Sequence, residues 1–294
     1  MAQEGETPAL SVVIPCLNAA ETIGVQLEAL SAQEWSRPWE VVVADNGSSD
    51  GSTAVVERFR GRLPHLRIVD AARKRGAAYA SNLGVRHARG ASIAFCDADD
   101  EVGAGWLAAV GEALTRHELV ACRGEAERLN EPWLQESRVV EPDRLSTSWF
   151  PPYVPIAGAG GIGVRRELHL RHGGFDEGLL GLYDVEYCIR LALAGHELVF
   201  LPDAVVHMRY RTRWAEIFGQ ARHYAHYGAA LQRRFKPAEA RFPGRLKWVV
   251  SGGRPLLQTL PKIRHRSARA KLAWLLGWQV GRYSGSVRFR VLAV

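Results

Sequence analysis

Four acidic residues in a stretch of five follow a short apolar run: Asp97, Asp99, Asp100 and Glu101. The run before them, residues 91–96, is typical of a buried strand in a parallel sheet. In open α/β sheets, ligands bind beyond the carboxyl ends of the strands. Carboxylates gathered there suit a hard divalent cation, which in turn bridges phosphate oxygens. A polar turn that caps the next helix is the alternative that spacing alone leaves open.

A second polar loop, residues 45–51, follows another apolar run, residues 40–44. We expect the two loops to face one another, because both follow neighbouring strands of the predicted sheet. Asp45 can accept a hydrogen bond from the imino group of a uracil or the amino group of a guanine. An Asx turn that caps the next helix is the alternative for this loop. Pro15 and Asn18 end the first apolar run beside the same predicted cleft.

These loops need a scaffold of alternating strands and helices. Strand patterns and amphipathic helix patterns alternate through the first 100 residues, which predicts an α/β fold with a mostly parallel central sheet flanked by helices. Beyond them we expect helices over 105–115 and 182–194, and strands over 198–201 and 204–207. Residues 130–160 are rich in Pro, Trp and Gly and predict a long ordered loop over the site.

The charge of the chain is distributed unevenly. Residues 1–208 hold 19 Lys/Arg and 29 Asp/Glu, a balance of −10, whereas residues 209–294 hold 19 and 2, a balance of +17. A segment this basic favours a polyanion as its partner. We therefore predict a catalytic domain over residues 1–210 and a basic, Trp-containing helical extension over residues 211–294.

Cysteine usage and hydropathy indicate the compartment. The four cysteines form no CxxC pair and lie in apolar contexts, so we expect buried free thiols and no zinc site. Residues 1–7 lack the composition of a signal peptide, and no apolar run approaches the roughly 18 residues of a membrane span. We expect a cytoplasmic protein, at most peripheral on the inner face of the cell membrane.

Five motifs in order resemble the family 2 inverting glycosyltransferases, which have the GT-A fold. The matching residues are Ser11-Val12-Val13-Ile14-Pro15 with Asn18; Val43-Ala44-Asp45-Asn46-Gly47-Ser48-Ser49-Asp50-Gly51; Arg75-Gly76 with Ala80 and Asn82; Phe95-Cys96-Asp97-Ala98-Asp99-Asp100; and Gly173-Gly174-Phe175-Asp176-Glu177 followed by Tyr183-Asp184-Val185-Glu186 with Arg190. Any one motif is weak, but their order and spacing over residues 10 to about 210 are specific.

The resemblance implies transfer of one sugar from a UDP-, GDP- or dTDP-linked donor to an acceptor hydroxyl, on a glycan, a lipid carrier or a small molecule. It implies a Mg²⁺ or Mn²⁺ ion that neutralises the leaving diphosphate. Carried over by motif, Asp97 and Asp99 form a DxD pair, with Asp99 as the direct metal ligand and Asp97 on ribose or a metal-bound water. Asp100 would touch the donor sugar. Asp45, helped by Asn46, would hold the base and ribose.

Asp184 matches the family's catalytic base. It lies at the predicted start of a helix, whose dipole we expect to keep it ionised. Helix capping is the structural alternative for Asp184, and Glu186 is the second candidate for the base. His207 matches a position that often supplies a further metal ligand in related enzymes. A hydrogen-bonded core histidine is its alternative.

The chain departs from the family pattern at three places. Tyr183 stands before the base where the family commonly has Glu, which puts acceptor or leaving-group contacts in doubt. Ser81 replaces an arginine that often approaches the diphosphate, so Arg75, next to Gly76, or Arg73 would have to compensate. The QxxRW motif of processive synthases is absent, which favours one sugar per binding event.

The basic extension carries Trp214, Trp248, Trp274 and Trp278. Arg/Lys interleaved with Trp on amphipathic helices favours an anionic membrane surface as partner. Packing of these helices on the catalytic domain is the alternative. Nucleic acid is disfavoured, because the acidic catalytic half would repel it. A catalytically silent membrane-associated scaffold and a nucleotidyltransferase are the alternative functions, although the latter usually needs a Gly-rich basic loop after its first strand.

Overall fold

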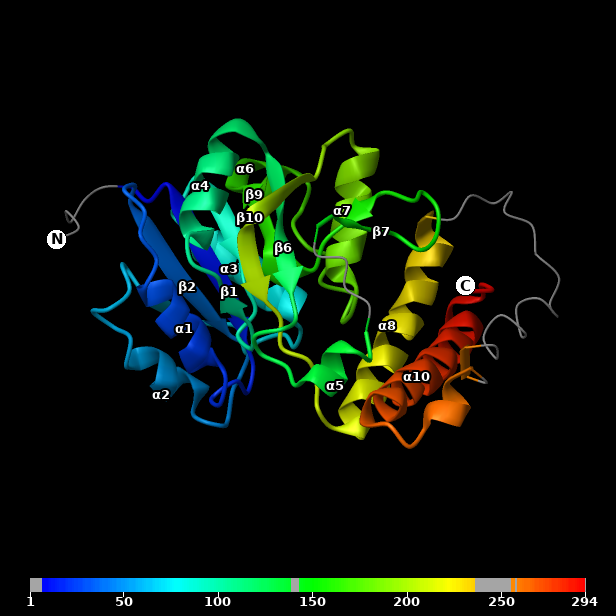
Figure 1. Cartoon of the computed structure of the whole chain (residues 1–294). Coiled ribbons are helices and arrows are strands. Elements are labelled where there is room, and N and C mark those ends of the chain that lie inside the picture. Colours follow the sequence, from blue (N-terminus) through cyan, green and yellow to red (C-terminus); the bar gives the residue numbers. More distant parts are fainter. Residues whose placement is uncertain (1–6, 139–142, 236–254, 257, 294) are drawn as a thin grey trace. The chain divides into compact units, whose positions relative to one another are not determined.

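The structure is a computed structural model that describes residues 7–138, 143–235, 255–256 and 258–293 (Figure 1). The chain divides into two compact units. Unit 1 comprises residues 1–128, 141–146 and 155–209, and unit 2 comprises residues 129–140, 147–154 and 210–294. That residues 1–210 form a catalytic domain and residues 211–294 an extension stays a prediction.

Unit 1 is built on an eight-stranded sheet with the order β3-β2-β1-β4-β9-β6-β10-β5. Its strands are β1 (Leu10–Cys16), β2 (Trp39–Asp45), β3 (Arg67–Asp70), β4 (Ser92–Phe95), β5 (Glu101–Val102), β6 (Leu119–Glu125), β9 (Ile162–Arg165) and β10 (Val199–His207). β9 runs antiparallel to both β4 and β6, and β5 runs antiparallel to β10. The other pairs are parallel, as predicted.

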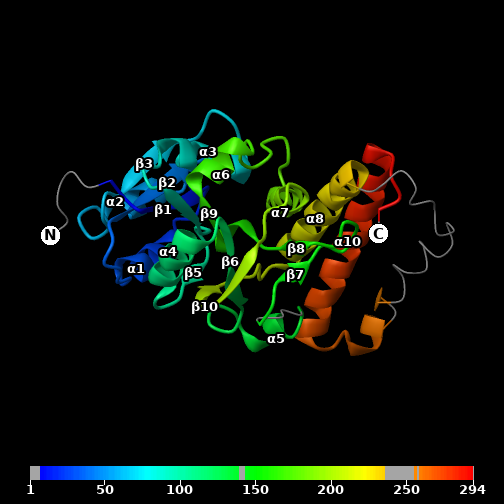
Figure 2. The ribbon, with the colours of Figure 1, turned by 90° about the horizontal axis from the view of Figure 1, so that it is seen from above.

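Helices cover both faces of this sheet (Figure 2). They are α1 (Ile23–Ser31), α2 (Ser52–Glu57), α3 (Ala77–His87), α4 (Trp106–Arg116), α6 (Arg166–Arg171) and α7 (Tyr183–Leu193). Alternate residues of β1 point to opposite faces: Val12 and Ile14 join the core formed with α1, α2 and α4, whereas Val13 faces α3. The α/β class with a mostly parallel sheet is therefore confirmed.

Two segments differ from the sequence-based expectation. The predicted strands 198–201 and 204–207 form one strand, β10, because a register shift between Leu201 and Val205 absorbs the Pro-Asp dipeptide between them. Residues 130–160 contain regular elements where we expected a loop. These elements are α5 (Pro132–Gln135), β7 (Ser146–Thr147), β8 (Pro155–Ile156) and the first residues of the 3₁₀ turn η1 (Ala159–Gly161).

Unit 2 contains α5 and two long helices, α8 (Trp214–Phe235) and α10 (Arg266–Phe289), with a short 3₁₀ turn, η2 (Leu260–Lys262), before α10. The helical extension predicted from its spacing is present in its described part. Among the described residues, no helix combines the length and apolarity that crossing a membrane requires.

Candidate active site

The topology brings the predicted chemistry to one edge of the sheet. β1, β2, β3 and β4 run parallel, and β6 and β10 run the same way because β9 is antiparallel to both β4 and β6. Their carboxyl ends therefore share one edge, and β9 begins there. That edge carries Asn18, Asp45, Asp97, the η1 turn and His207, which is the arrangement expected of a ligand site in an α/β sheet.

Side chains of the 45–51 loop join it to the segment after β1. Asp50 Oδ2 accepts a hydrogen bond from the Ala20 amide at 2.9 Å, and its Oδ1 accepts from the Ser52 amide and hydroxyl. Asn18 Oδ1 accepts from the Ser49 amide at 2.9 Å. Asp45 accepts from the Ser48 amide, three residues further along the chain, through long bonds of 3.2 and 3.3 Å. Its half-buried carboxylate keeps acceptor positions for a ligand.

Asn46 uses its whole side chain to hold the loop after β3. Its Nδ2 donates to the carbonyls of Ala71 at 2.6 Å and Lys74 at 2.8 Å, and its Oδ1 accepts from the Gly76 amide at 2.8 Å. Asn46 is also 7% exposed. Both amide hydrogens are thus occupied within the protein, so this geometry favours a positioning role for Asn46 rather than a direct contact with a base.

The loop held by Asn46 ends at Gly76, which precedes α3. Gly76 has φ +136°, and a Cβ there would lie 3.2 Å from Leu180 Cδ2, so a side chain would be strained at this position. Arg73 and Arg75 are exposed on the same loop, and neither side chain has an ion pair with another described residue. The loop therefore presents two guanidinium groups that are available to an anionic ligand.

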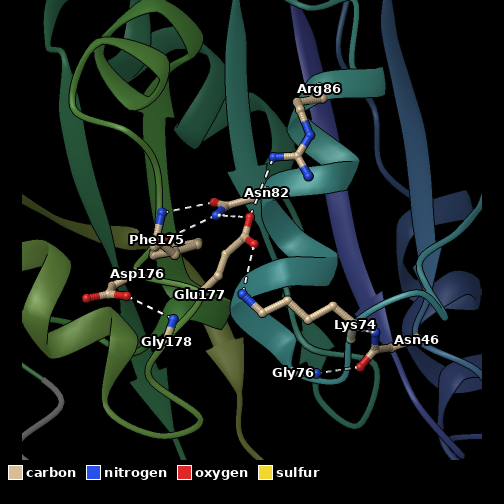
Figure 3. A network of polar contacts seen from close by, with 9 residues as sticks. All are labelled: Asn46, Lys74, Gly76, Asn82, Arg86, Phe175, Asp176, Glu177 and Gly178. Carbon is tan, nitrogen blue, oxygen red and sulfur yellow. Dashed lines mark hydrogen bonds and ion pairs between the residues drawn. The ribbon is translucent and has the colours of Figure 1, made fainter.

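Asn82 and Glu177 connect α3 to the Gly173–Glu177 segment (Figure 3). Asn82 Oδ1 accepts from the Phe175 amide at 2.9 Å, and its Nδ2 donates to the Phe175 carbonyl at 2.8 Å and to Glu177 Oε1 at 3.1 Å. Glu177 also lies 3.2 Å from Lys74 Nζ and 3.6 Å from Arg86. Burial raises the pKa of Glu177, but these partners outweigh it, so the pKa is lowered. The Asn46-held loop and the segment before Asp184 are thus tied to one carboxylate.

The η1 turn lies between the two central carboxylates. A Cβ at Gly160 would lie 2.7 Å from Asp97 Oδ2, and the Ala159 amide donates to Asp184 Oδ2 at 3.1 Å. Asp97 follows β4 and Asp184 is in the first turn of α7, so residues 87 positions apart meet on either side of three small residues. This close approach requires glycine at position 160.

Burial raises the pKa of the Asp184 carboxyl above its ordinary value, although the amides of Val185 and Ala159 act in the opposite direction. The expected effect of the helix dipole is therefore outweighed. A carboxyl with a raised pKa is a stronger base, which suits proton abstraction. Glu186, the second candidate for the base, is fully buried and makes a bidentate ion pair with Arg190 at 2.9 Å. This leaves Asp184 as the accessible carboxylate of α7.

The acidic cluster after β4 is held by Arg209, which follows β10. Asp100 is 8% exposed, and its Oδ1 accepts from the Arg209 amide at 2.8 Å. Arg209 Nε donates to the Asp99 carbonyl at 2.9 Å. Asp97 and Asp99 are only half-buried. The backbone of the cluster is fixed by Arg209, while the carboxylates of Asp97 and Asp99 stay within reach of solvent or a ligand.

His207 ends β10 at the same edge of the sheet. Its Nδ1 is buried without a hydrogen-bond partner among the described residues, and Glu125 Oε2 lies 3.4 Å away. The described residues contain no group of three or more His, Cys, Asp or Glu arranged to hold a metal ion. Mg²⁺ is commonly bound by one or two carboxylates, and substrate phosphates and water complete its coordination shell. The half-buried carboxylates of Asp97 and Asp99 fit a cation of that kind, whereas His207 Nδ1 is buried beside Glu125.

The structure also identifies residues whose roles the sequence did not indicate. Asn82, Glu177 and Arg209 position neighbouring loops, and η1 connects Asp97 with Asp184. Asn82 and Glu177 lie within the quoted motifs, so their positions were visible but their partners were not. No sequence pattern pointed to Arg209, because it is one of many arginines at the start of the basic segment.

The GT-A type fold and its acidic edge define the glycosyltransferase class. The family model "Glycosyl transferase family 2" matches residues 11–172, which is more than half of the chain. The chain belongs to glycosyl transferase family 2, as the motifs predicted.

Two curated relatives illustrate the similarity. The chain is 38% identical over 96 residues to the uncharacterised glycosyltransferase YibD of Escherichia coli, which covers 33% of this chain and 27% of YibD. It is 36% identical over 101 residues to the glycosyltransferase AglE of Haloferax volcanii, which covers 34% of this chain and 33% of AglE. The chain thus spans no more than a third of the length of either relative.

Solved structures extend the similarity in fold to nearly the whole chain. A mannosyltransferase from Pyrobaculum calidifontis, in complex with GDP-Man and Mn²⁺, has a TM-score of 0.67 at 23% identity, covering 96% of this chain and 88% of that one. S. aureus TarS in complex with UDP-GlcNAc has a TM-score of 0.55 at 16% identity, covering 96% and 92%. At these identities the likeness shows the fold alone.

Proposed function

We propose that this chain is a metal-dependent inverting glycosyltransferase that moves one sugar from a nucleotide-diphosphate sugar to an acceptor hydroxyl. The observation that carries the proposal is the η1 turn, which has Asp97 on one side and Asp184 on the other. This proximity supports the proposed roles, in which Asp97 would hold the donor and Asp184 would accept a proton beside the same short backbone segment. Single displacement requires that relation between leaving group and base.

The donor would lie along the edge of the sheet. Asp45 would accept a hydrogen bond from the base, and Arg75 or Arg73 would approach the diphosphate from the loop that Asn46 holds. Pro15, Asn18 and Gly76 would shape the nucleotide pocket, and Asp100 would support the donor-sugar side through its fixed position. The relatives that bind GDP-Man and UDP-GlcNAc support a nucleotide-sugar donor of this class.

Asp99, Asp97 and His207 would hold a Mg²⁺ or Mn²⁺ ion, which supplies charge neutralisation for the departing diphosphate. The Mn²⁺ in the mannosyltransferase complex is consistent with a divalent cation. Asp184 would accept the proton of the acceptor hydroxyl at its carboxylate, and the Ala159 and Val185 amides would orient it. Tyr183, where the family commonly has Glu, would face the acceptor or leaving group.

A hydrolysis screen of UDP-, GDP- and dTDP-linked sugars, with and without Mn²⁺, tests this proposal without knowledge of the acceptor. Slow, metal-dependent release of one nucleoside diphosphate is expected, and Asp99→Asn should abolish it. Equal release by the parent, Asp99→Asn and Asp184→Asn would refute the assigned roles. Absence of both release and nucleotide-diphosphate binding would favour a catalytically silent scaffold.

The acceptor proposed here lies near a membrane, on the cytoplasmic side, because the basic extension favours an anionic surface as partner.

A further inference from the structure

One face of α10 is closed by α8. Gly277, Gly281 and Gly285 recur every fourth residue of α10, and a Cβ at each would collide with a backbone carbonyl of α8. Those carbonyls belong to Phe218, Arg222 and His226, which have the same spacing. The two helices therefore pack backbone to backbone along this row, and no further partner can reach that side of α10.

The described tryptophans of the extension contact other aromatic or basic side chains of unit 2. Trp278 contacts Trp149 at a ring separation of 5.8 Å and stacks on Trp274 at 6.4 Å, while Arg138 lies 4.5 Å above the Trp274 ring. Trp214 packs on Trp133 at 5.5 Å. These contacts help to hold unit 2 together and leave Trp274 and Trp278 half-buried, whereas Trp214 is 39% exposed. A membrane contact through the tryptophans therefore stays a prediction. Trp248 lies outside the described residues.

A different face of α10 carries exposed apolar side chains. Leu276, Val280 and Tyr283 are 40–44% exposed, and Val287 is 81% exposed. Their spacing of four, three and four residues places them in one row, which we call the α10 stripe. The stripe extends roughly 16 Å at the helical rise per residue. Leu260 and Ile263, in and after η2, are exposed apolar residues as well.

The charge of α10 identifies the chemistry of its partner. α10 contains no acidic residue and five basic ones, of which Arg282 is buried; the four exposed cations are Arg266, Arg269, Lys271 and Arg288. Lys271 and Arg288 form no ion pair with another described residue. A second copy of this surface would bring like charges together, which disfavours self-association through the stripe. An anionic lipid surface instead complements the cations and accepts the apolar side chains.

We propose that the α10 stripe is a membrane-docking surface that inserts into the headgroup region of an anionic bilayer, to which the exposed cations of α10 add electrostatic attraction. One short apolar row binds a bilayer only weakly, so stable docking requires both the stripe and the cations. This inference refines the membrane partner of the proposed function. It does not depend on glycosyl transfer, because lipid binding is measured without donor or acceptor.

Vesicle flotation of the full chain tests the proposal. The parent should float with vesicles of phosphatidylcholine mixed with phosphatidylglycerol, and not with phosphatidylcholine alone. The triple variant Leu276→Ser/Val280→Ser/Val287→Ser should lose about tenfold in binding. A matched control, Val25→Ser/Leu170→Ser/Leu193→Ser, removes exposed apolar side chains from unit 1 and should bind like the parent.

The contribution of charge is tested by Lys271→Glu/Arg288→Glu, which should also lose binding, and by added salt, which should weaken the parent. Far-ultraviolet circular dichroism of each variant confirms that it is folded. Equal binding by the parent and the stripe variant would overturn the proposal. So would a parent that ignores anionic vesicles but forms a dimer that the stripe variant dissociates in sedimentation. In every case donor hydrolysis by the stripe variant reports separately on the proposed function.

Discussion

At the scale of single residues, Asp184 is subject to two opposed demands. Its position beside the η1 turn and within the first turn of α7 provides amide donors, whereas burial raises its pKa. Burial removes part of the water that would stabilise the charged carboxylate. The loss lowers the stability of the folded state and raises the basicity of the carboxylate. This is the trade-off expected of a catalytic group in a partly enclosed site.

Asp184→Asn should therefore lower glycosyl transfer by about 10²- to 10⁴-fold, the range for loss of a general base, and should raise the melting temperature near neutral pH. Because the folded pKa lies above the ordinary value of 3.8, the native state binds the proton more tightly than the unfolded chain. The stability difference between variant and parent should thus be small below pH 3.8 and grow as pH rises through the native pKa. Thermal melts across pH measure it, and a lower melting temperature for the variant at neutral pH would contradict it.

Lys74 and Glu177 offer a second test at this scale, because their ion pair links the loop carrying Arg75 to the segment before Asp184. Lys74→Met and Glu177→Gln should each raise the KM for the donor, and the double variant should match one single variant. Each effect should be about twofold to fivefold, as expected of a partly exposed pair. The measurement is a double-mutant cycle on KM and kcat.

The control for this cycle is the exposed pair Arg171–Glu167 on α6, whose variants Arg171→Met and Glu167→Gln should leave the KM unchanged. Strictly additive effects of the Lys74 and Glu177 substitutions would show that the two side chains act independently.

At the scale of elements, close backbone contact decides how α8 and α10 pair. Glycine lowers the intrinsic stability of each helix, but at positions 277, 281 and 285 it allows the helix axes to approach. A Cβ added at Gly219 on α8 would meet no heavy atom within 4 Å. Glycine at this position therefore lowers the stability of the helix without allowing a closer helix contact. Gly219 can therefore serve as the control for the glycines of α10.

Gly281→Ala should destabilise unit 2 by about 1–3 kcal/mol, because the added methyl group meets the Arg222 carbonyl and Ala225. Gly219→Ala should instead stabilise it by up to about 1 kcal/mol through helix propensity. Denaturant unfolding followed by tryptophan fluorescence compares the two. Similar effects of both substitutions would show that α8 and α10 do not pack as described.

At the scale of the whole molecule, all four thiols belong to unit 1 and serve as a probe of its unfolding. All four are free thiols; Cys16, Cys96 and Cys188 are buried as expected, whereas Cys122 is half-buried. Burial raises the pKa of each thiol, to about 12 for Cys122 and Cys188. The reactive thiolate is therefore scarce in the folded state.

Thiol labelling at mildly alkaline pH should consequently be negligible in the native protein and complete after unfolding. Its dependence on denaturant should follow the unfolding of unit 1. Quantitative absorbance of a released thiol chromophore measures it, with the fully denatured chain as reference. Rapid labelling of one or more cysteines without denaturant would contradict the burial described here.

The fold class, the family and the polar loops could be predicted from the sequence. Local apolar patterns indicate strands and helices, and parallel connections decide which strand ends share an edge. The sequence also placed Asp97, Asp99 and Asp184 in named motifs. Tertiary structure decided what these residues touch. Contacts between segments far apart in sequence bring Asp97 and Asp184 to the two sides of η1. They also engage the Asn46 side chain in hydrogen bonds with the 71–76 loop. The pairing of Glu186 with Arg190 is local, but the burial of Glu186 depends on the packing of α7.

The same distinction holds for the basic extension. Composition predicted helices with tryptophan and excess positive charge, but it could not say which face of α10 would meet α8. Both faces of α10 carry apolar residues, so periodicity alone does not indicate which face is buried. Only the approach of the two backbones at the three glycines decides that the Leu276–Val287 row is left to solvent while Trp274 and Trp278 pack within unit 2.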